Sequence, residues 1–273
     1  MTRSPLRGGN RLEWQADSLA SASTTGIVEG AAISYSQPAV RTRHANYTHI
    51  RLRNWDVTFT QMAVSTAGIK NDVAREVLKA LKTLVLDYEK IFLNTGNTGA
   101  GSTSSARTAK GLQKAIVTNT AVGTGTGSSG DIQLTEDNVN LIMQKIWTQG
   151  GDPRVLLCGG HQKRVISKKF TAKTGFSWQI PASTRMAISN INKYEGAFGT
   201  VDIIADRQHM TRRITIITPD LVRIAVLRDI QQYKGAPTAS SIKGWVEAEM
   251  TLEWGNEKGH GKHSYLKSGG TIS

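Results

Sequence analysis

Two clusters contain residue types that occur in catalytic or metal sites. Cys158 and His161 stand three positions apart in CGGH, which could supply a thiol nucleophile and a neighbouring base. Residues this close in sequence, at a strand end and a helix start, rarely meet productively, so we expect Cys158 to be a buried structural cysteine. His260 and His263 could ligate a metal, but two histidines do not complete a ligand set. We expect them to be solvated polar residues.

A glycine-rich segment, GTGSSG at residues 125–130, matches the pattern G-x-G-x-x-G. A dinucleotide site needs a strand directly before this motif and a helix that opens within it. Here residues 131–134 separate the segment from the helix cap expected at Thr135, so a surface loop is the better interpretation. The sequence contains no concentrated set of catalytic or metal-binding residues, and we predict no enzymatic activity, no cofactor and no metal.

The chain as a whole is strongly basic. Its 273 residues include 34 Lys and Arg against 21 Asp and Glu, a formal net charge of +13, which favours a polyanionic partner. The single cysteine excludes an intrachain disulfide. No apolar run approaches the roughly 18–20 residues of a membrane span, and the first residues lack the apolar region of a signal peptide. We therefore expect a protein that is made in the cytoplasm and does not contact a membrane.

Positive charge is concentrated between residues 153 and 194, a span without any acidic residue. This span could neutralise nucleic-acid phosphates or meet acidic faces of a neighbouring copy. Aromatic stacking partners are sparse in it, which argues against specific reading of single strands. We favour a subunit contact, with the following residues as candidates: Lys163, Arg164, Lys168 and Lys169.

Two N-terminal segments lack the composition of an independent core. Residues 1–36 are rich in Gly, Ser, Thr and Ala, and they are expected either to be disordered or to lie across another surface. Residues 37–64 alternate apolar and polar side chains and are expected to be extended. The apolar positions change parity between Leu52 and Trp55, which predicts a bulge or turn near Arg53.

Four arginines make the extended segment a basic arm: Arg41, Arg43, Arg51 and Arg53. An extended basic arm with no helix behind it needs a partner surface, so we predict that these arginines and Trp55 contact a neighbouring subunit. An ordinary two-stranded hairpin folded on its own domain is the alternative.

The strongest helical pattern runs from residue 71 to residue 94. Its apolar side chains recur every three or four positions, at Val73, Val77, Leu81, Leu84, Tyr88 and Ile91. Asn71 or Asp72 can cap the start of this helix. A second helix is expected from a cap at Thr135 to Trp147, and residues 154–158 indicate a buried strand.

Strand patterns dominate the chain after Pro181, at residues 186–192, 200–205, 213–218, 221–228 and 245–254. The last of them alternates an apolar face with the acidic face of Glu247, Glu249 and Glu253, which is typical of a half-buried antiparallel strand. We expect this acidic face to meet basic arms across subunit interfaces. The order of helices and strands predicts an α+β fold.

Several passages, taken in order, resemble the major capsid proteins of tailed bacteriophages with the Hong Kong 97-type fold. Residues 46–72 resemble the opening N-Y-T-Q-I … V-S-x-T-x-x-A of one branch, with His49 where that branch tends to carry Gln. Residues 76–94 resemble its long spine helix, and residues 107–116 resemble its R-x-x-x-G-L passage. Further similar passages lie at 146–167, 191–210, 222–229 and 246–261.

The resemblance implies a division of the chain. Residues 1–36 would be an N-terminal arm, 37–66 an extended loop, and 67–130 a peripheral domain with the spine helix at 71–94. Residues 131–240 would form an axial domain, and 241–273 a return strand to the peripheral domain with a C-terminal tail. Some members cross-link through a Lys in the extended loop. Residues 37–66 contain no Lys, so we predict no such cross-link.

The resemblance further implies a virion protein, made in the host cytoplasm, that assembles with itself into hexamers and pentamers of an icosahedral head. Its expected partners are portal, scaffolding and decoration proteins, with enclosed double-stranded DNA held by nonspecific contacts. The alternative is a nucleic-acid-binding coat protein or nucleoprotein that uses the basic 153–194 stretch. A cytosolic enzyme ranks third, because no catalytic set is present.

Overall fold

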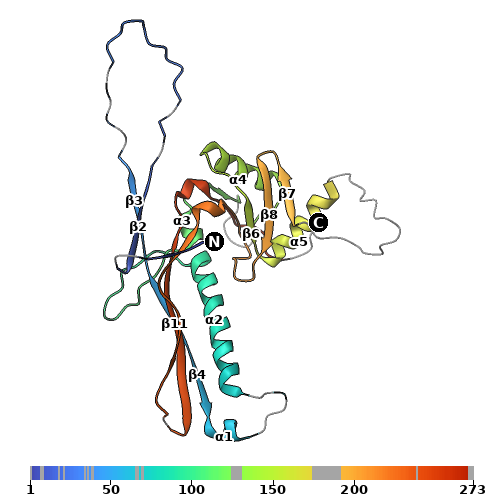
Figure 1. Cartoon of the computed structure of the whole chain (residues 1–273). Helices are drawn as coiled ribbons and strands as arrows, with labels where there is room; N and C mark the ends of the chain where they lie inside the picture. The colour runs from blue at the N-terminus through green and yellow to red at the C-terminus, as the bar shows by residue number, and fades with distance from the viewer. Residues whose placement is uncertain are drawn as a thin grey trace, which may run out of the picture.

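The structure is a computed structural model that describes residues 2–269 except 7–8, 18, 21, 34, 36, 38–39, 65–67, 69–70, 124–130, 174–191 and 238. Its helices and strands form two sheets, each with its own apolar core, and a separate hairpin (Figure 1). This mixed architecture confirms the predicted α+β class. No helix among the described residues is long and apolar enough to cross a membrane.

The first sheet has four strands in the spatial order β1 (Thr2–Pro5), β10 (Arg223–Lys234), β11 (Ser241–Glu253) and β4 (His49–Thr58). Strands β10, β11 and β4 are antiparallel, and β1 is added to β10 in parallel. The long helix α2 (Asp72–Asn94) packs on β4 and β11 (Figure 1). A short helix, α1 (Phe59–Ala63), links β4 toward α2.

The pairing of β4 with β11 is unbroken from Thr58 opposite Ser241 to His49 opposite Met250. The bulge predicted near Arg53 is therefore wrong. Odd-numbered residues of β4 face α2 throughout, and the apolar Ile50 and Leu52 lie on the exposed outer face of the sheet. The change of parity in the sequence reflects apolar residues on both faces of one regular strand.

The second sheet has six strands, in the order β5 (Thr120–Val122), β12 (Gly261–Ser264), β9 (Ile214–Ile217), β6 (Val155–Cys158), β8 (Gly199–Ala205) and β7 (Lys193–Gly196). Helix α4 (Glu136–Thr148) packs against β5 and β12, and α5 (Gly160–Lys173) packs against β8. The remaining short elements are α3 (Leu112–Ala115), η1 (Pro219–Leu221) and η2 (Glu257–Gly259). The chain crosses between the sheets more often than expected, since β10 lies in the first sheet and β12 returns to the second. The strand expected at 186–192 falls almost entirely outside the described residues.

The third unit is a two-stranded hairpin of β2 (Arg11–Ala16) and β3 (Thr42–Tyr47), which are paired in antiparallel. Residues 17–41, called the projecting loop below, connect these strands and extend far from the two sheets (Figure 1). The structure thus divides the N-terminal region differently from the expected 1–36 arm and 37–66 loop. What projects is 17–41, whereas most of 37–66 is paired in β3 and β4.

Helix α2 matches the predicted helix closely in extent, and Asn71 caps it by accepting a hydrogen bond from the backbone N–H of Ala74 at 3.0 Å. The buried face differs from the predicted stripe by one position. Ala80 and Leu84 are buried, but Leu81 is 37% exposed. The stripe repeats closer to a true 3.6-residue period than the count by threes and fours allowed.

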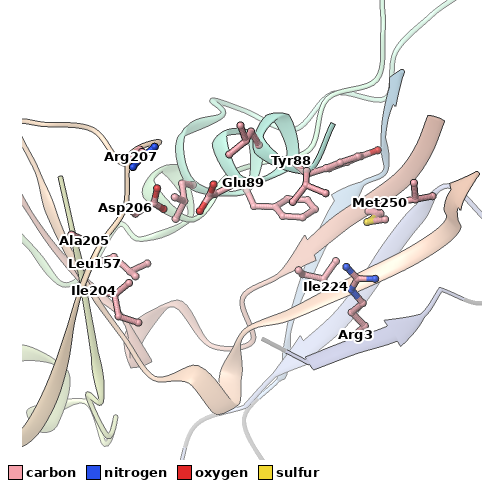
Figure 2. Close-up of a pocket in the computed structure, with 15 residues that line it drawn as sticks. Arg3, Tyr88, Glu89, Leu157, Ile204, Ala205, Asp206, Arg207, Ile224 and Met250 are labelled. Atoms are coloured by element: carbon pink, nitrogen blue, oxygen red, sulfur yellow. The ribbon is translucent and has the colours of Figure 1, made fainter. Parts of the chain in front are cut away.

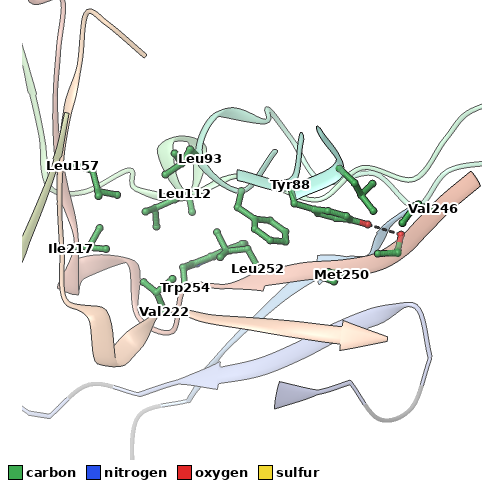
Figure 3. Close-up of a cluster of buried hydrophobic side chains, with 14 of the residues drawn as sticks. Tyr88, Leu93, Leu112, Leu157, Ile217, Val222, Val246, Met250, Leu252 and Trp254 are labelled. Carbon is green, nitrogen blue, oxygen red and sulfur yellow. Dashed lines mark hydrogen bonds between the residues drawn. The ribbon is translucent and has the colours of Figure 1, made fainter. Parts of the chain in front are cut away.

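The core of the first sheet joins α2 to β4, β10 and β11 (Figure 3). Tyr88 holds its phenolic oxygen 2.5 Å from the carbonyl of Ala248 on β11 and 3.0 Å from that of His49 on β4. Burial raises the pKa of Tyr88, so its hydroxyl stays protonated and can donate. Gly244 leaves room for the ring of Trp55, with which a Cβ at that position would collide.

We predict that Leu84→Ala lowers the free energy of unfolding by about 2–5 kcal/mol, because it opens a cavity under α2. Leu81→Ala is the matched control, the same substitution on the exposed side of the helix, and should cost less than about 1 kcal/mol. Urea unfolding followed by circular dichroism measures both. Equal losses for the two variants would contradict the assigned buried face.

Candidate intersubunit interface

Cys158 lies in the core of the second sheet and is fully buried. Burial raises the pKa of its thiol to about 11, so a thiolate is scarcely populated at neutral pH. This confirms the prediction of a structural cysteine. His161 lies at the start of α5, and it does not activate Cys158.

His260 and His263 are buried, so the prediction of solvated residues is wrong. The backbone N–H of Thr218 donates to Nδ1 of His260 at 3.3 Å, and Nε2 of His260 lies 2.9 Å from the carbonyl of Trp254. Burial lowers the pKa of both histidines. They are satisfied core residues, and no group of three potential metal ligands occurs in the part of the chain that the structure describes. The 125–130 segment lies outside it.

The arginines of β4 are bound within their own chain. Arg51 donates through Nε to Asp87 on α2 at 2.8 Å, and Arg53 donates to both oxygens of the same carboxylate at 2.6 and 2.7 Å. Burial acts to raise the pKa of Asp87, but the hydrogen bonds from Arg53 and Arg51 outweigh it and lower that pKa. This pairing replaces the contact with a neighbour's carboxylate that we predicted for these two arginines.

The other two arginines of the predicted basic arm lie on the hairpin. Arg41 pairs with Asp17, and Arg43 pairs with Glu13, each at 3.4 Å and with largely exposed side chains. Exposed pairs of this kind contribute little and exchange readily. Contact of Arg41 and Arg43 with a neighbouring subunit remains a prediction. Trp55 is 5% exposed in the core under α2, so its surface is not accessible to a neighbour in this conformation.

Glu249 is the centre of a buried ionic network, with a side chain only 4% exposed. It accepts from Thr48 Oγ1 at 2.6 Å, from Arg107 at 2.6 Å and from Nε of Arg228 at 3.0 Å. Arg228 also pairs with Glu247. These carboxylates were predicted to meet basic arms of neighbours, yet the structure shows them bound to arginines of the same chain. Contact through Glu253 remains a prediction.

Asn46, next to Thr48 in the NYT sequence, is a second buried polar residue. Its side-chain amide donates to the carbonyls of Leu252 at 2.8 Å and Lys110 at 3.2 Å, and it accepts from the Lys110 backbone at 2.7 Å. Three passages that lie far apart in the chain meet at this residue. The resemblance marked these passages, but only the fold shows why a buried amide is needed there.

The basic 153–194 stretch is described only in part, since residues 174–191 lie outside the described residues. Lys163 on α5 donates to Asn192 Oδ1 at 3.2 Å and to the Ile203 carbonyl at 3.3 Å. Arg164 and Lys168 are exposed on the same helix, and Lys169 is half-buried. Their contact with a neighbouring subunit remains a prediction.

The most exposed apolar side chains belong to the projecting loop. Six of its residues are 72–99% exposed: Leu19, Ile27, Val28, Ile33, Tyr35 and Val40. Exposed apolar surface of this extent marks an interaction site in a soluble protein. The base of the loop is firmly attached, because Trp14 on β2 donates to the Gly255 carbonyl at 2.8 Å and packs edge-on against Trp254.

A projecting hairpin, a long helix on an antiparallel sheet and a second mixed domain together define a capsid subunit with the Hong Kong 97-type fold. The family model for the SU10 major capsid protein matches residues 7–267, and the chain belongs to this family.

Solved structures show the same fold at low sequence identity. A capsid protein of cyanophage A-1(L) matches with a TM-score of 0.69 and 11% identity, covering 94% of this chain and 88% of that one. The native gene-transfer-agent (GTA) particle capsid matches with a TM-score of 0.65 and 11% identity, covering 97% and 88%. The SrpI encapsulin of Synechococcus elongatus matches with a TM-score of 0.60 and 10% identity, covering 97% and 85%. No curated protein matches the sequence.

We predict that Glu249→Gln lowers the free energy of unfolding by about 2–4 kcal/mol, because it leaves Arg107 and Arg228 without their buried counter-ion. Glu247→Gln on the same strand is the matched control and should cost less than about 1 kcal/mol, as expected for a more exposed pair. Thermal unfolding of the two variants measures the difference. A Glu249→Gln variant as stable as Glu247→Gln would show that the network carries no net stability.

Charge reversal on β4 should act on the fold of the single chain. Arg53→Glu places a carboxylate against Asp87 and is expected to lower the melting temperature by several degrees at low salt. Arg43→Glu on the exposed hairpin is the control and should leave the melting temperature nearly unchanged. If the unassembled Arg53→Glu chain melts like the wild type, the pairing with Asp87 does not hold α2 on the sheet.

Proposed function

We propose that this chain is the repeating shell subunit of a tailed-phage head, that it assembles with itself into hexamers and pentamers, and that the shell encloses double-stranded DNA. One observation carries the mechanism: the projecting loop exposes six large apolar side chains that its own chain does not cover. Burial of such side chains stabilises by about 25 cal/mol per Å² of apolar surface, and a neighbouring copy is the surface that a repeating shell supplies.

The outer face of the first sheet is a suitable surface for a neighbour's projecting loop. Ile50 and Leu52 are exposed there, and the rings of Tyr233 and Trp245 stack at 5.4 Å beside them. This face is wide, apolar in part and free of covering helices among the described residues. Each copy would thus both offer a loop and receive one, which is the requirement for a repeating contact.

The remaining parts of the proposal concern partners and place. The subunit would be made in the host cytoplasm, become part of the virion, and act with portal, scaffolding and decoration proteins. Enclosed DNA would be held by nonspecific contacts of exposed basic residues with phosphates. The fold family supports a structural rather than an enzymatic role. The nucleoprotein alternative would need the basic stretch on α5, where Lys163 already binds groups of its own chain.

The test replaces Ile27, Val28, Ile33 and Tyr35 by Ser, which keeps the length of the projecting loop. We expect a chain with unchanged melting temperature that no longer forms closed shells in negative-stain microscopy. Glu29→Gln in the same loop is the control and should form shells normally. Closed shells from the four-serine variant would overturn the proposed role of the loop. Deletion of residues 1–36 is a less specific test, because it also removes β1 and β2.

A further inference from the structure

Helix α2 covers only part of the first sheet. It packs on β4 and β11, and beside it an apolar groove of about 550 Å³ remains between α2, β10 and the edge of the second sheet (Figure 2). Ile224 and Ile230 of β10 line one side of the groove, Phe92 of α2 another, and Leu157 and Ile204 of the second sheet a third.

The apolar surface continues along α2 beyond the groove. Leu78, Leu81 and Val85 follow one another at spacings of three and four, so they lie on one side of the helix, and they are 37–58% exposed. At 1.5 Å per residue this strip is about 10 Å long. The strip and the groove together form an elongated apolar surface rather than a closed pocket for a small molecule.

The shape of this surface fits a second helix lying beside α2. Packed helices lie about 8–10 Å apart, so a helix next to α2 would rest on the inner face of β10 in the same layer. Ile224, Val226 and Ile230 present that inner face, and all three are only partly buried against the existing core. The sheet therefore has an apolar floor for two helices and holds one.

Charge around the groove favours an acidic occupant. Arg3 and Arg207 line it, and Arg75 and Lys82 are exposed on the outer side of α2. Two of the nearby carboxylates are partly neutralised. Asp229 pairs with Arg3 at 3.9 Å, and Glu89 faces Asp206 (Figure 2), where burial and that neighbouring carboxylate raise the pKa of Glu89.

We propose that this groove binds an amphipathic helix, apolar on one face and acidic on the other, from a separate protein that takes part in assembly. The proposal rests on the proposed shell function, since a shell subunit must be guided by partners that differ from it. A second copy is the less suitable occupant, because each copy carries a net charge of +13 and would bring further positive charge to a basic rim.

The test uses a fluorescently labelled synthetic peptide of about 18 residues, with Leu at helical spacing and Glu elsewhere, titrated with the unassembled full chain. Two further peptides are controls: one with the same composition in scrambled order, and one with Lys in place of Glu. Fluorescence anisotropy at low and physiological salt reports binding. We expect binding of the ordered acidic peptide alone, weaker at higher salt.

Substitutions locate the binding on the chain. Leu81→Glu and Val85→Glu place charge in the apolar strip at exposed positions and should weaken binding by about tenfold or more. Val117→Glu is the matched control, an exposed valine outside the groove, and should bind as the wild type does. Equal melting temperatures would show that all three variants are folded.

Three results would overturn the proposal: no binding of the ordered acidic peptide, equal binding of the control peptides, or undiminished binding by Val85→Glu. Concentration-dependent dimerisation that Val85→Glu abolishes and Val117→Glu preserves would also overturn it, because a second copy would then occupy the groove. Shell formation by the wild type is scored separately by microscopy. A failure of peptide binding is thereby distinguished from a failure of the proposed shell function.

Discussion

The attachment of α2 to the β4–β11 ladder is the constraint on which the rest of the chain depends. The hydroxyl of Tyr88 reaches carbonyl oxygens on both strands, and Asp87, one position earlier, binds two arginines of β4. Both contacts require the register observed between the strands. A slip of one residue would turn Arg51, Arg53 and Trp55 to the outer face and bring Ile50 and Leu52 under the helix.

This attachment also explains how the chain distributes its charge. The carboxylates of Asp87 and Glu249 are each shared by two arginines, so the most buried acidic groups of the first sheet act within the chain. The positive charge that remains is on the exposed surfaces of α2 and α5 and at the rim of the groove. A partner therefore meets a basic surface, whereas the acidic face that the sequence suggested for β11 is largely used internally.

The elements with local signals were predictable from the sequence. The extent of α2, its Asn71 cap, the Thr135 cap of α4 and the alternation along β11 all depend on residues a few positions apart. The features that were missed depend on distant partners. Glu249 resembles a solvated charge until Arg107 is placed beside it, and the true base of the projecting loop is set by the pairing of 11–16 with 42–47, which composition does not reveal.

The order of strands in the first sheet has a consequence for the nascent chain. Strand β4 ends at Thr58, and its partner β11 begins only at Ser241, while β1 waits for β10. At synthesis rates of about 5–20 residues per second, β4 leaves the ribosome roughly 10–40 s before β11 does. During that time its hydrogen-bonding edges and its apolar residues on both faces have no native partner. Copies made side by side on one message can pair these edges with each other, so correct folding of this chain competes with intermolecular strand exchange from the moment of its synthesis.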